Sequence, residues 1–390
     1  MEESLAKFIV EHGDDDTSRL VLSASRFPGI DVRLASTMIE ARRKAASKLP
    51  QWHACPYIEY PSSLSMEQCS SQATALYKQA FVPEGCTMAD ITGGLGVDCF
   101  YMSRKAKEAF YFERSEELCN AARNNFPRLG AKNVTVCCGD HIDASRSYGL
   151  IYADPARRGA RSERVYSVRD CEPDIVSLKS DLLKLSDRLL VKISPMADVS
   201  STLELFPEAT QLHIVSSGNE CKELLVFIDR KEAGTGCRIV CADLTPAGET
   251  LFEFTPAEEE NASTIYADHI EKFLYQPLKA VLKGGAFKLL SERYSLKKLA
   301  PSTHLYTSDT AISSFPGRIY EVEKVLDWNK RTLSSLKKEI PAAEMLSVNF
   351  PIATDELRRR SGIAEGSKKR ILATTLGGGK DSKVLIICSR

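Results

Sequence analysis

Residues 90–98, "DITGGLGVD", place three glycines within four positions between two aspartates, directly after the short apolar run "CTMA" at 86–89. Glycine has no Cβ, so it tolerates positive φ and lets another group approach the backbone closely. The stretch predicts a tight turn between a strand that ends at Asp90 and a helix that begins near Val97. Backbone N–H groups at the start of that helix would face a bound ligand.

The chain around this turn alternates between short apolar runs and amphipathic stretches. The runs that predict strands lie at 86–91, 108–113, 133–140, 148–155, 187–195, 210–217 and 223–228, with helical stretches such as 115–126 and 173–185 between several of them. This alternation predicts an α/β fold with a doubly wound, Rossmann-like parallel sheet. Only five residues separate the last two runs, which favours an antiparallel pair at the sheet edge.

The sequence on either side of this region does not alternate between predicted strands and helices in the same way. Apolar residues at helical spacing predict helices at 4–12, 31–49 and 65–81, then, beyond the sheet, a hairpin within 236–255 and a long helix-like stretch at 266–294. The tail predicts helices at 329–340 and 354–362, a strand at 345–350 and two final strands joined by a glycine turn. We therefore divide the chain into an N-terminal helical region (1–80), a sheet domain (81–230), a connecting region (231–320) and a small α+β domain (321–390).

Composition limits the possible partners. Lys plus Arg and Asp plus Glu both number 52, so nucleic acid would have to bind a local patch. No apolar run approaches the roughly 20 residues of a membrane span, and the acidic start "MEESLAKFIVEHGDDD" is unlike a signal peptide, which predicts a cytosolic protein with no membrane partner. The twelve cysteines are scattered and include no CxxC pair, so we expect free thiols and no metal.

Acidic residues follow four successive predicted strands: Asp90, Glu113, Asp140 and Asp154. Ligands of an open parallel sheet bind at the carboxyl ends of its strands. The four carboxylates therefore mark the predicted site.

The pattern distinguishes two cofactors. A dinucleotide fingerprint needs a third glycine where Cys99 stands. S-adenosylmethionine has no pyrophosphate; its amino group, ribose diol and adenine amine need acceptors, and Asp90, Glu113 and Asp140 are placed for these three functions. We predict S-adenosylmethionine over a nicotinamide cofactor, and to its site we also assign Thr92, Gly93, Gly94, Gly96, Asp98, Arg114 and His141.

Several motifs together resemble a known family. The chain is similar to class I S-adenosylmethionine-dependent methyltransferases, and more closely to the bacterial group that joins such a domain to a ferredoxin-like piece and a C-terminal THUMP-like domain. The stretches that carry the resemblance are "EQCSSQATALYK" at 67–78, "ADITGGLGVD" at 89–98, "DPARRG" at 154–159, "HLYTSD" at 304–309, "NFP" at 349–351 and "ELRRR" at 356–360. The resemblance implies methyl transfer, with RNA as the substrate.

"DPARRG" bears on the target atom. In similar amino-methyltransferases the stretch is Asp or Asn, two prolines and an aromatic, which hold an exocyclic amino group in line with the methyl group. Asp154 and Pro155 match this pattern, whereas Ala156 and Arg157 depart from it, and Arg157 could stack on a base or bind phosphate.

A similar motif occurs in carbon-5 uracil methyltransferases. These need a nucleophilic cysteine after the next strand, and this chain has "VKISPM" there, with Lys192 and no cysteine. We therefore favour an exocyclic nitrogen over carbon. Lys192 either acts in the site or reaches solvent from its strand end. The predicted catalytic residues are Asp154, Pro155, Arg157 and Lys192.

Residues 356–370 hold six basic residues against two acids. We predict an RNA contact there, made by Arg358, Arg359, Arg360, Lys368, Lys369 and Arg370. The predicted function is methylation of an RNA nucleobase, with the C-terminal domain presenting the RNA. The alternatives are an inactive RNA-binding protein, which the Ala156 and Arg157 departures favour, and a small-molecule or protein methyltransferase. The sequence leaves the RNA species and the oligomeric state open.

Overall fold

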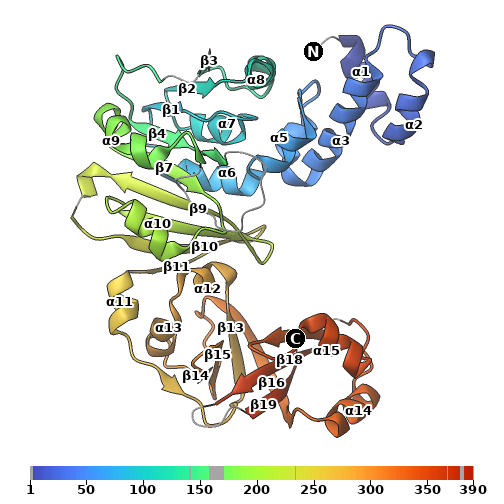
Figure 1. Ribbon diagram of the computed structural model, residues 1–390, viewed down its shortest axis with the longest axis vertical. Helices are drawn as coiled ribbons and strands as arrows, with labels where there is room; N and C mark the ends of the chain where they lie inside the picture. The colour runs from blue at the N-terminus through green and yellow to red at the C-terminus, as the bar shows by residue number, and fades with distance from the viewer. Residues whose placement is uncertain are drawn as a thin grey trace. The chain divides into compact units, whose positions relative to one another are not determined.

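The computed structural model describes residues 3–139, 142–157, 171–232, 234–366, 368–377 and 382–389, with only the backbone of Arg157. The chain divides into two compact units (Figure 1). Unit 1 comprises Met1–His213 and Lys222–Gly236, and unit 2 comprises Ile214–Cys221 and Cys237–Arg390.

Unit 1 begins with α1 (Glu3–Glu11) and α3 (Val32–Lys48), where helices were expected, and with α2 (Thr17–Leu22), η1 (Ala24–Arg26) and α4 (Pro50–Ala54), which were not predicted. Asp31 caps α3 by accepting a hydrogen bond from the Leu34 amide at 3.0 Å. Helices α3 and α4 share a core with the sheet domain, where Trp52 of α4 packs edge-on against Phe100 with 5.8 Å between ring centroids.

The single helix predicted at 65–81 is wrong. The structure has α5 (Ser63–Gln68), a break at residues 69–71, α6 (Gln72–Lys78) and η2 (Gln79–Phe81). Ser71 begins α6 by accepting a hydrogen bond from the Thr74 amide at 3.2 Å. Serine is a preferred N-cap residue, so the sequence starts a new helix where the apolar periodicity alone suggested continuity.

The parallel part of the sheet contains β1 (Thr87–Asp90), β2 (Glu108–Glu113), β3 (Val134–Cys138), β4 (Leu150–Ala153) and β7 (Arg188–Ile193). Their connections include α7 (Val97–Ser103), α8 (Glu116–Arg128) and α9 (Ile175–Leu185). Strand β1 lies between β2 and β4, so the strand order reverses beside β1. This reversal is where an open α/β sheet binds its ligand.

The remaining strands extend the order. Strand β9 (Glu220–Asp229) is antiparallel to β7, and α10 (Val199–Leu205) and β8 (Gln211–Ser217) precede it. Within the described residues the order is β11-β10-β8-β9-β7-β4-β1-β2-β3. The predicted edge position of β8 and β9 is therefore wrong, because the hairpin of β10 (Arg238–Thr245) and β11 (Gly248–Phe254) follows β8.

Two short strands follow Asp154. Residues Ala156–Arg157 form β5, which pairs antiparallel with β6 (Cys171–Glu172). The backbone of Cys171 therefore lies opposite that of Arg157. Between β9 and β10 the chain forms η4 (Arg230–Glu232).

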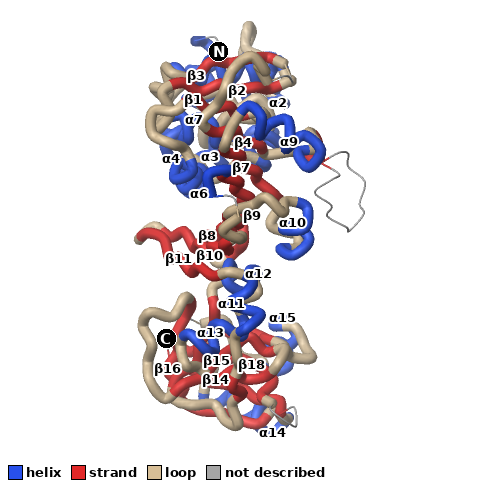
Figure 2. Tube along the Cα trace, turned by 90° about the vertical axis from the view of Figure 1, so that its left-hand side faces the viewer, coloured by secondary structure: helices blue, strands red, loops and turns tan. Residues whose placement is uncertain are grey.

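Unit 2 contains a second sheet, whose strands include β14, β15, β16 and β18 (Figure 2). Within the described residues its order is β12-β14-β15-β13-β16-β19-β18-β17. The strands are β12 (Ile265–Tyr266), β13 (Phe273–Pro277), β14 (Lys297–Ala300), β15 (Thr303–Ser308), β16 (Gly317–Asp327), β17 (Glu344–Val348), β18 (Lys369–Leu376) and β19 (Ser382–Ser389). Its helices are α11 (Pro256–Asn261), α12 (Lys279–Gly284), α13 (Phe287–Arg293), α14 (Lys330–Glu339) and α15 (Thr354–Ser361).

The helix-like prediction for 266–294 is wrong. Residues 273–277 form β13, whose Leu274 and Tyr275 are fully buried, and two short helices follow it. Pro277 disfavours a continuous helix, and Gly285 ends α12 at φ +82°. The α14, β17, α15 and final two-strand pattern of the tail is as expected.

Among the described helices, none is long and apolar enough to cross a membrane. The same residues contain no cluster of three or more His, Cys, Asp or Glu side chains that could hold a metal ion.

Candidate active site

The glycine turn after β1 is shaped by two different requirements. Gly94 and Gly96 adopt positive φ, +55° and +85°, which glycine accommodates without strain. At Gly93 a Cβ would lie 2.3 Å from the Tyr111 ring, so this position must stay small for the protein's own packing. The sequence suggested that a ligand approaches the backbone of these glycines. At Gly93 the group that comes close is the ring of Tyr111.

Glu113 connects the turn to the next helix. Its Oε2 accepts a hydrogen bond from the Gly94 amide and its Oε1 one from the Ser115 amide, both at 2.8 Å. A carboxylate has about four acceptor positions, so Glu113 retains capacity for the two hydroxyls of a ribose.

Asp90 is buried beneath the turn. Its Oδ1 accepts a hydrogen bond from the Thr92 amide at 3.0 Å, and the Thr92 hydroxyl accepts one from the Asp154 amide at 2.6 Å. Burial raises the pKa of Asp90 to about 8, and the neighbouring carboxylates of Asp98, Asp154 and Glu113 contribute to the increase. Asp90 is therefore mainly protonated at neutral pH.

Lys192 and Asp154 form an ion pair where β7 and β4 end. Lys192 Nζ lies 2.6 Å from Asp154 Oδ2, and the Lys192 side chain is only 14% exposed. Burial opposes the Lys192 charge, but Asp154, Asp98 and Glu223 outweigh it and raise the pKa of Lys192 above its ordinary value. The alternative that Lys192 reaches solvent is wrong.

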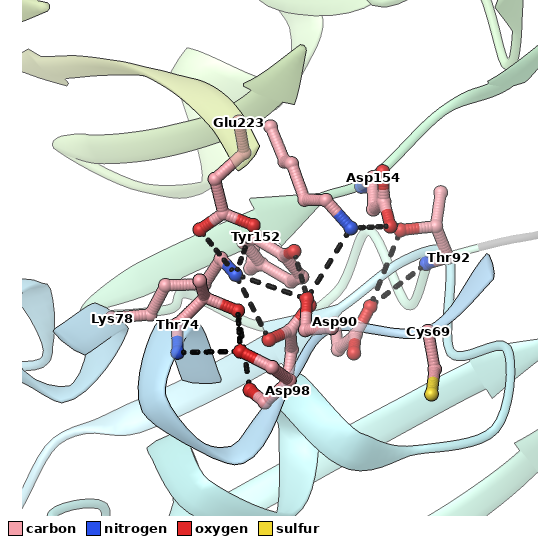
Figure 3. A network of polar contacts seen from close by, with 12 residues as sticks. Cys69, Thr74, Lys78, Asp90, Thr92, Asp98, Tyr152, Asp154 and Glu223 are labelled. Carbon is pink, nitrogen blue, oxygen red and sulfur yellow. Dashed lines mark hydrogen bonds and ion pairs between the residues drawn. The ribbon is translucent and has the colours of Figure 1, made fainter. Parts of the chain in front are cut away.

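A buried charge network lies beside this pair, as Figure 3 shows, and sequence reasoning missed most of it. Lys78 of α6 is fully buried, with its Nζ 3.1 Å from Asp98 Oδ1, 2.9 Å from Glu223 Oε2 and 3.1 Å from Ser70 Oγ. Tyr152 also donates a hydrogen bond to Asp98, at 2.7 Å.

The network gives Asp98, which the sequence assigned to the cofactor, partners inside the protein. Burial disfavours its charged form, yet Lys78 and Lys192, with hydrogen bonds from Tyr152 and Ser70, lower the pKa of Asp98. Its carboxylate is thus engaged inside the protein, and its cofactor contact stays a prediction. There was little sign of Lys78 and Glu223 in the sequence. Lys78 lies in a predicted helix, and Glu223 directly precedes the apolar run "LLVF".

The other predicted residues differ in how much of their surroundings the structure describes. Arg114 is 64% exposed and pairs with Glu172 at 2.7 Å. Pro155 is half-buried after Asp154. Of Arg157 only the backbone is described, and Asp140 and His141 lie outside the described residues.

The predicted RNA residues separate into exposed and buried groups. Arg359 and Arg360 are exposed on α15, and both pair with Glu356, at 2.7 and 2.6 Å. Lys368 is exposed, whereas Arg358 is half-buried and Lys369 pairs with Glu323.

Arg370 is the exception. It is 3% exposed, bonded to Glu344 and stacked 4.6 Å from the Tyr320 ring centroid. The expected RNA contact of Arg370 is wrong, because its position on β18 directs the guanidinium into these partners.

Comparisons with known proteins agree with this architecture. A family described as a ferredoxin-like domain matches residues 273–316, and one described as THUMP domain-like matches 317–390. The solved structure of a "putative methyltransferase" from Porphyromonas gingivalis W83 matches with a TM-score of 0.91 and 35% identity, over 99% of this chain and 97% of that chain. The chain belongs to the same family. It has the class I methyltransferase fold with a ferredoxin-like piece and a THUMP-like domain.

More distant likenesses are partial. A tRNA m1G37 methyltransferase from M. jannaschii matches 41% of this chain and 51% of its own at 10% identity, with a TM-score of 0.30. An rRNA methylase from Streptococcus thermophilus matches over 40% of this chain and 93% of its own, at 14% identity and with a TM-score of 0.29. Neither bears on the substrate of this family member. No curated protein matches the chain.

Proposed function

We propose that this protein transfers a methyl group from S-adenosylmethionine to an exocyclic nitrogen of an RNA base. The observation that carries the proposal is the double anchoring of Asp154: its amide is bonded to Thr92 and its Oδ2 to Lys192. Within the described residues Asp154 Oδ1 has no hydrogen-bond partner, and we assign it to the amino group of the acceptor.

The cofactor assignment rests on the turn and the acids around it. Asp90 and Glu113 are the last residues of two adjacent parallel strands, and Glu113 is bonded to the glycine turn itself. We assign the amino group of the cofactor to Asp90 and its ribose diol to Glu113. The family fold supports the same cofactor.

The chemistry needs position more than acid–base catalysis. The methyl group of a sulfonium is already activated, so aligning the acceptor nitrogen provides most of the acceleration. The Asp154 carboxylate is held by Lys192, and we assign it the role of orienting an N–H group by accepting its hydrogen bond.

RNA is supported by the C-terminal part of the chain. The THUMP-like match covers 317–390, and α15 exposes Arg359 and Arg360 within it. Phosphate contacts of this kind bind RNA without reading sequence. A paired base cannot be reached by the site, so the target is unpaired or flipped out.

The test measures cofactor binding and transfer separately. Calorimetry should detect binding of S-adenosylmethionine and none of NAD, and labelled methyl groups should be transferred to total cellular RNA. Asp154→Ala should lower transfer by about 100-fold because alignment is lost, with cofactor affinity within about twofold. The exposed Asp181→Ala, on α9, is the control.

Other results would select the alternatives. RNA binding without transfer by the wild type would identify an inactive RNA-binding protein. Transfer to protein or small molecules alone would remove RNA as the substrate. A methylated carbon, with activity lost in Cys171→Ser, would indicate the covalent route, since β6 brings Cys171 beside the Asp154 motif.

A further inference from the structure

We propose that Ser70, held by Lys78 and Asp98, is a positioning residue that orients Lys192 and through it Asp154. The proposal rests on the proposed function. Ser70 lies in the break between α5 and α6, outside the sheet that carries the acids. It would make the N-terminal helical region part of the methyl-transfer site.

The hydroxyl of Ser70 is fully used. Its oxygen donates a hydrogen bond to Asp98 Oδ2 at 2.7 Å and accepts one from Lys78 Nζ at 3.1 Å and one from Lys192 Nζ at 3.3 Å. A serine hydroxyl has one hydrogen and two lone pairs, so these three contacts fix its orientation.

The partners of Ser70 cannot easily move. Asp98 also binds Tyr152 and Lys78, and Lys78 reaches a second buried acid, Glu223. All four are buried. Displacing any member would leave a buried charge without its partner, which is strongly unfavourable. The network therefore holds the Ser70 hydroxyl in a fixed position.

Lys192 connects this support to the site. Its ammonium group has three N–H donors; one binds Asp154 and another binds Ser70. Asp154 is 36% exposed, so its own surroundings confine it less than those of Asp98. Without Ser70 the ammonium loses its fixed direction, and the carboxylate turns with it.

Ser70 is separable from the helix caps around it. The caps are Ser62 for α5, which binds the Ser65 amide, and Ser71 for α6, which binds the Thr74 amide. Replacing Ser70 leaves both hydrogen bonds in place. Ser103 offers a matched control, because it is also buried and its hydroxyl donates to the Phe100 carbonyl at 2.8 Å within α7.

The first experiment uses the full-length protein as wild type, Ser70→Ala, Ser70→Thr and Ser103→Ala. Ser70→Ala should lower kcat for transfer to RNA by at least about tenfold, with the KM for S-adenosylmethionine within about twofold. Ser70→Thr keeps the hydroxyl and should recover most of kcat, and Ser103→Ala should match the wild type. Wild-type kcat in Ser70→Ala, or no recovery in Ser70→Thr, would overturn the proposal.

The second experiment needs no substrate. NMR of lysine labelled with 13C at Cε should show a Lys192 signal, assigned with Lys192→Met, that shifts in Ser70→Ala and stays in place in Ser103→Ala. A wild type without RNA methylation whose Lys192 signal still responds to Ser70→Ala would refute the proposed function alone. Transfer with an unresponsive Lys192 signal would refute the positioning role alone.

Discussion

Asp90 illustrates how the fold changes a residue that the sequence had already singled out. Its place at the end of β1 was predictable from the apolar run before it. Its protonation was not, because this depends on burial and on three carboxylates brought close by folding. Most of the acid is neutral at pH 7 as a result.

The raised pKa of Asp90 predicts a pH dependence of stability. In the unfolded chain Asp90 ionises near pH 4, whereas the folded protein holds the proton until about pH 8. The folded state therefore binds more protons across this window, and stability should fall as pH rises, by up to about 1.4 kcal/mol per unit from this group. Asp90→Asn should remove that part of the slope.

Urea unfolding at several pH values between 5 and 8 measures the effect. Trp52 is buried in unit 1, so its fluorescence in a Trp328→Phe background follows that unit. Equal slopes with and without the Asp90→Asn substitution would show that Asp90 ionises normally.

The site was partly predictable from single residues. Asp90, Glu113 and Asp154 follow strands that apolar runs located correctly. Ser70, Lys78 and Glu223 were not found, because their role depends on contacts between distant parts of the chain; Lys78 and Glu223 are 145 positions apart. Periodicity along a chain does not show such a contact.

At the scale of elements, runs of apolar residues identified strands better than spacing identified helices. The strands of the parallel sheet lie where expected, whereas the helix at 65–81 is broken and the one at 266–294 contains a strand. Both errors occur where a serine cap, a proline or a glycine pair interrupts a pattern that is otherwise helical.

The turn after β1 gives a prediction at this scale. Gly93→Ala would place a Cβ 2.3–2.7 Å from the ring of buried Tyr111. Overpacking of this kind should destabilise unit 1 by about 1–3 kcal/mol. Gly13→Ala is the control, since its nearest neighbour would be 3.4 Å away. Urea midpoints compare the two, and equal midpoints would show that Tyr111 can move aside.

At the scale of the whole molecule, charge is balanced, with 52 basic and 52 acidic residues. The proposed RNA binding then depends on a few exposed cations. Arg359→Gln with Arg360→Gln should weaken RNA binding and reduce its salt slope by about two, because two phosphate contacts are lost, while cofactor affinity stays constant.

The matched control removes the same charge elsewhere. Lys7→Gln with Arg19→Gln neutralises two exposed cations on α1 and α2. Equal loss of RNA affinity in both double variants would mean that net charge, and not α15, governs the binding.

The buried lysine also concerns how this protein could be divided or recombined. A fragment that starts at residue 81, where the apolar runs begin, would keep Asp98 and Glu223 but lose Lys78 and Ser70. Two acids would then remain in the interior with no cation from the N-terminal helices. A shortened or recombined protein must therefore keep the helices and the sheet together, so that both sides of that charge contact are present.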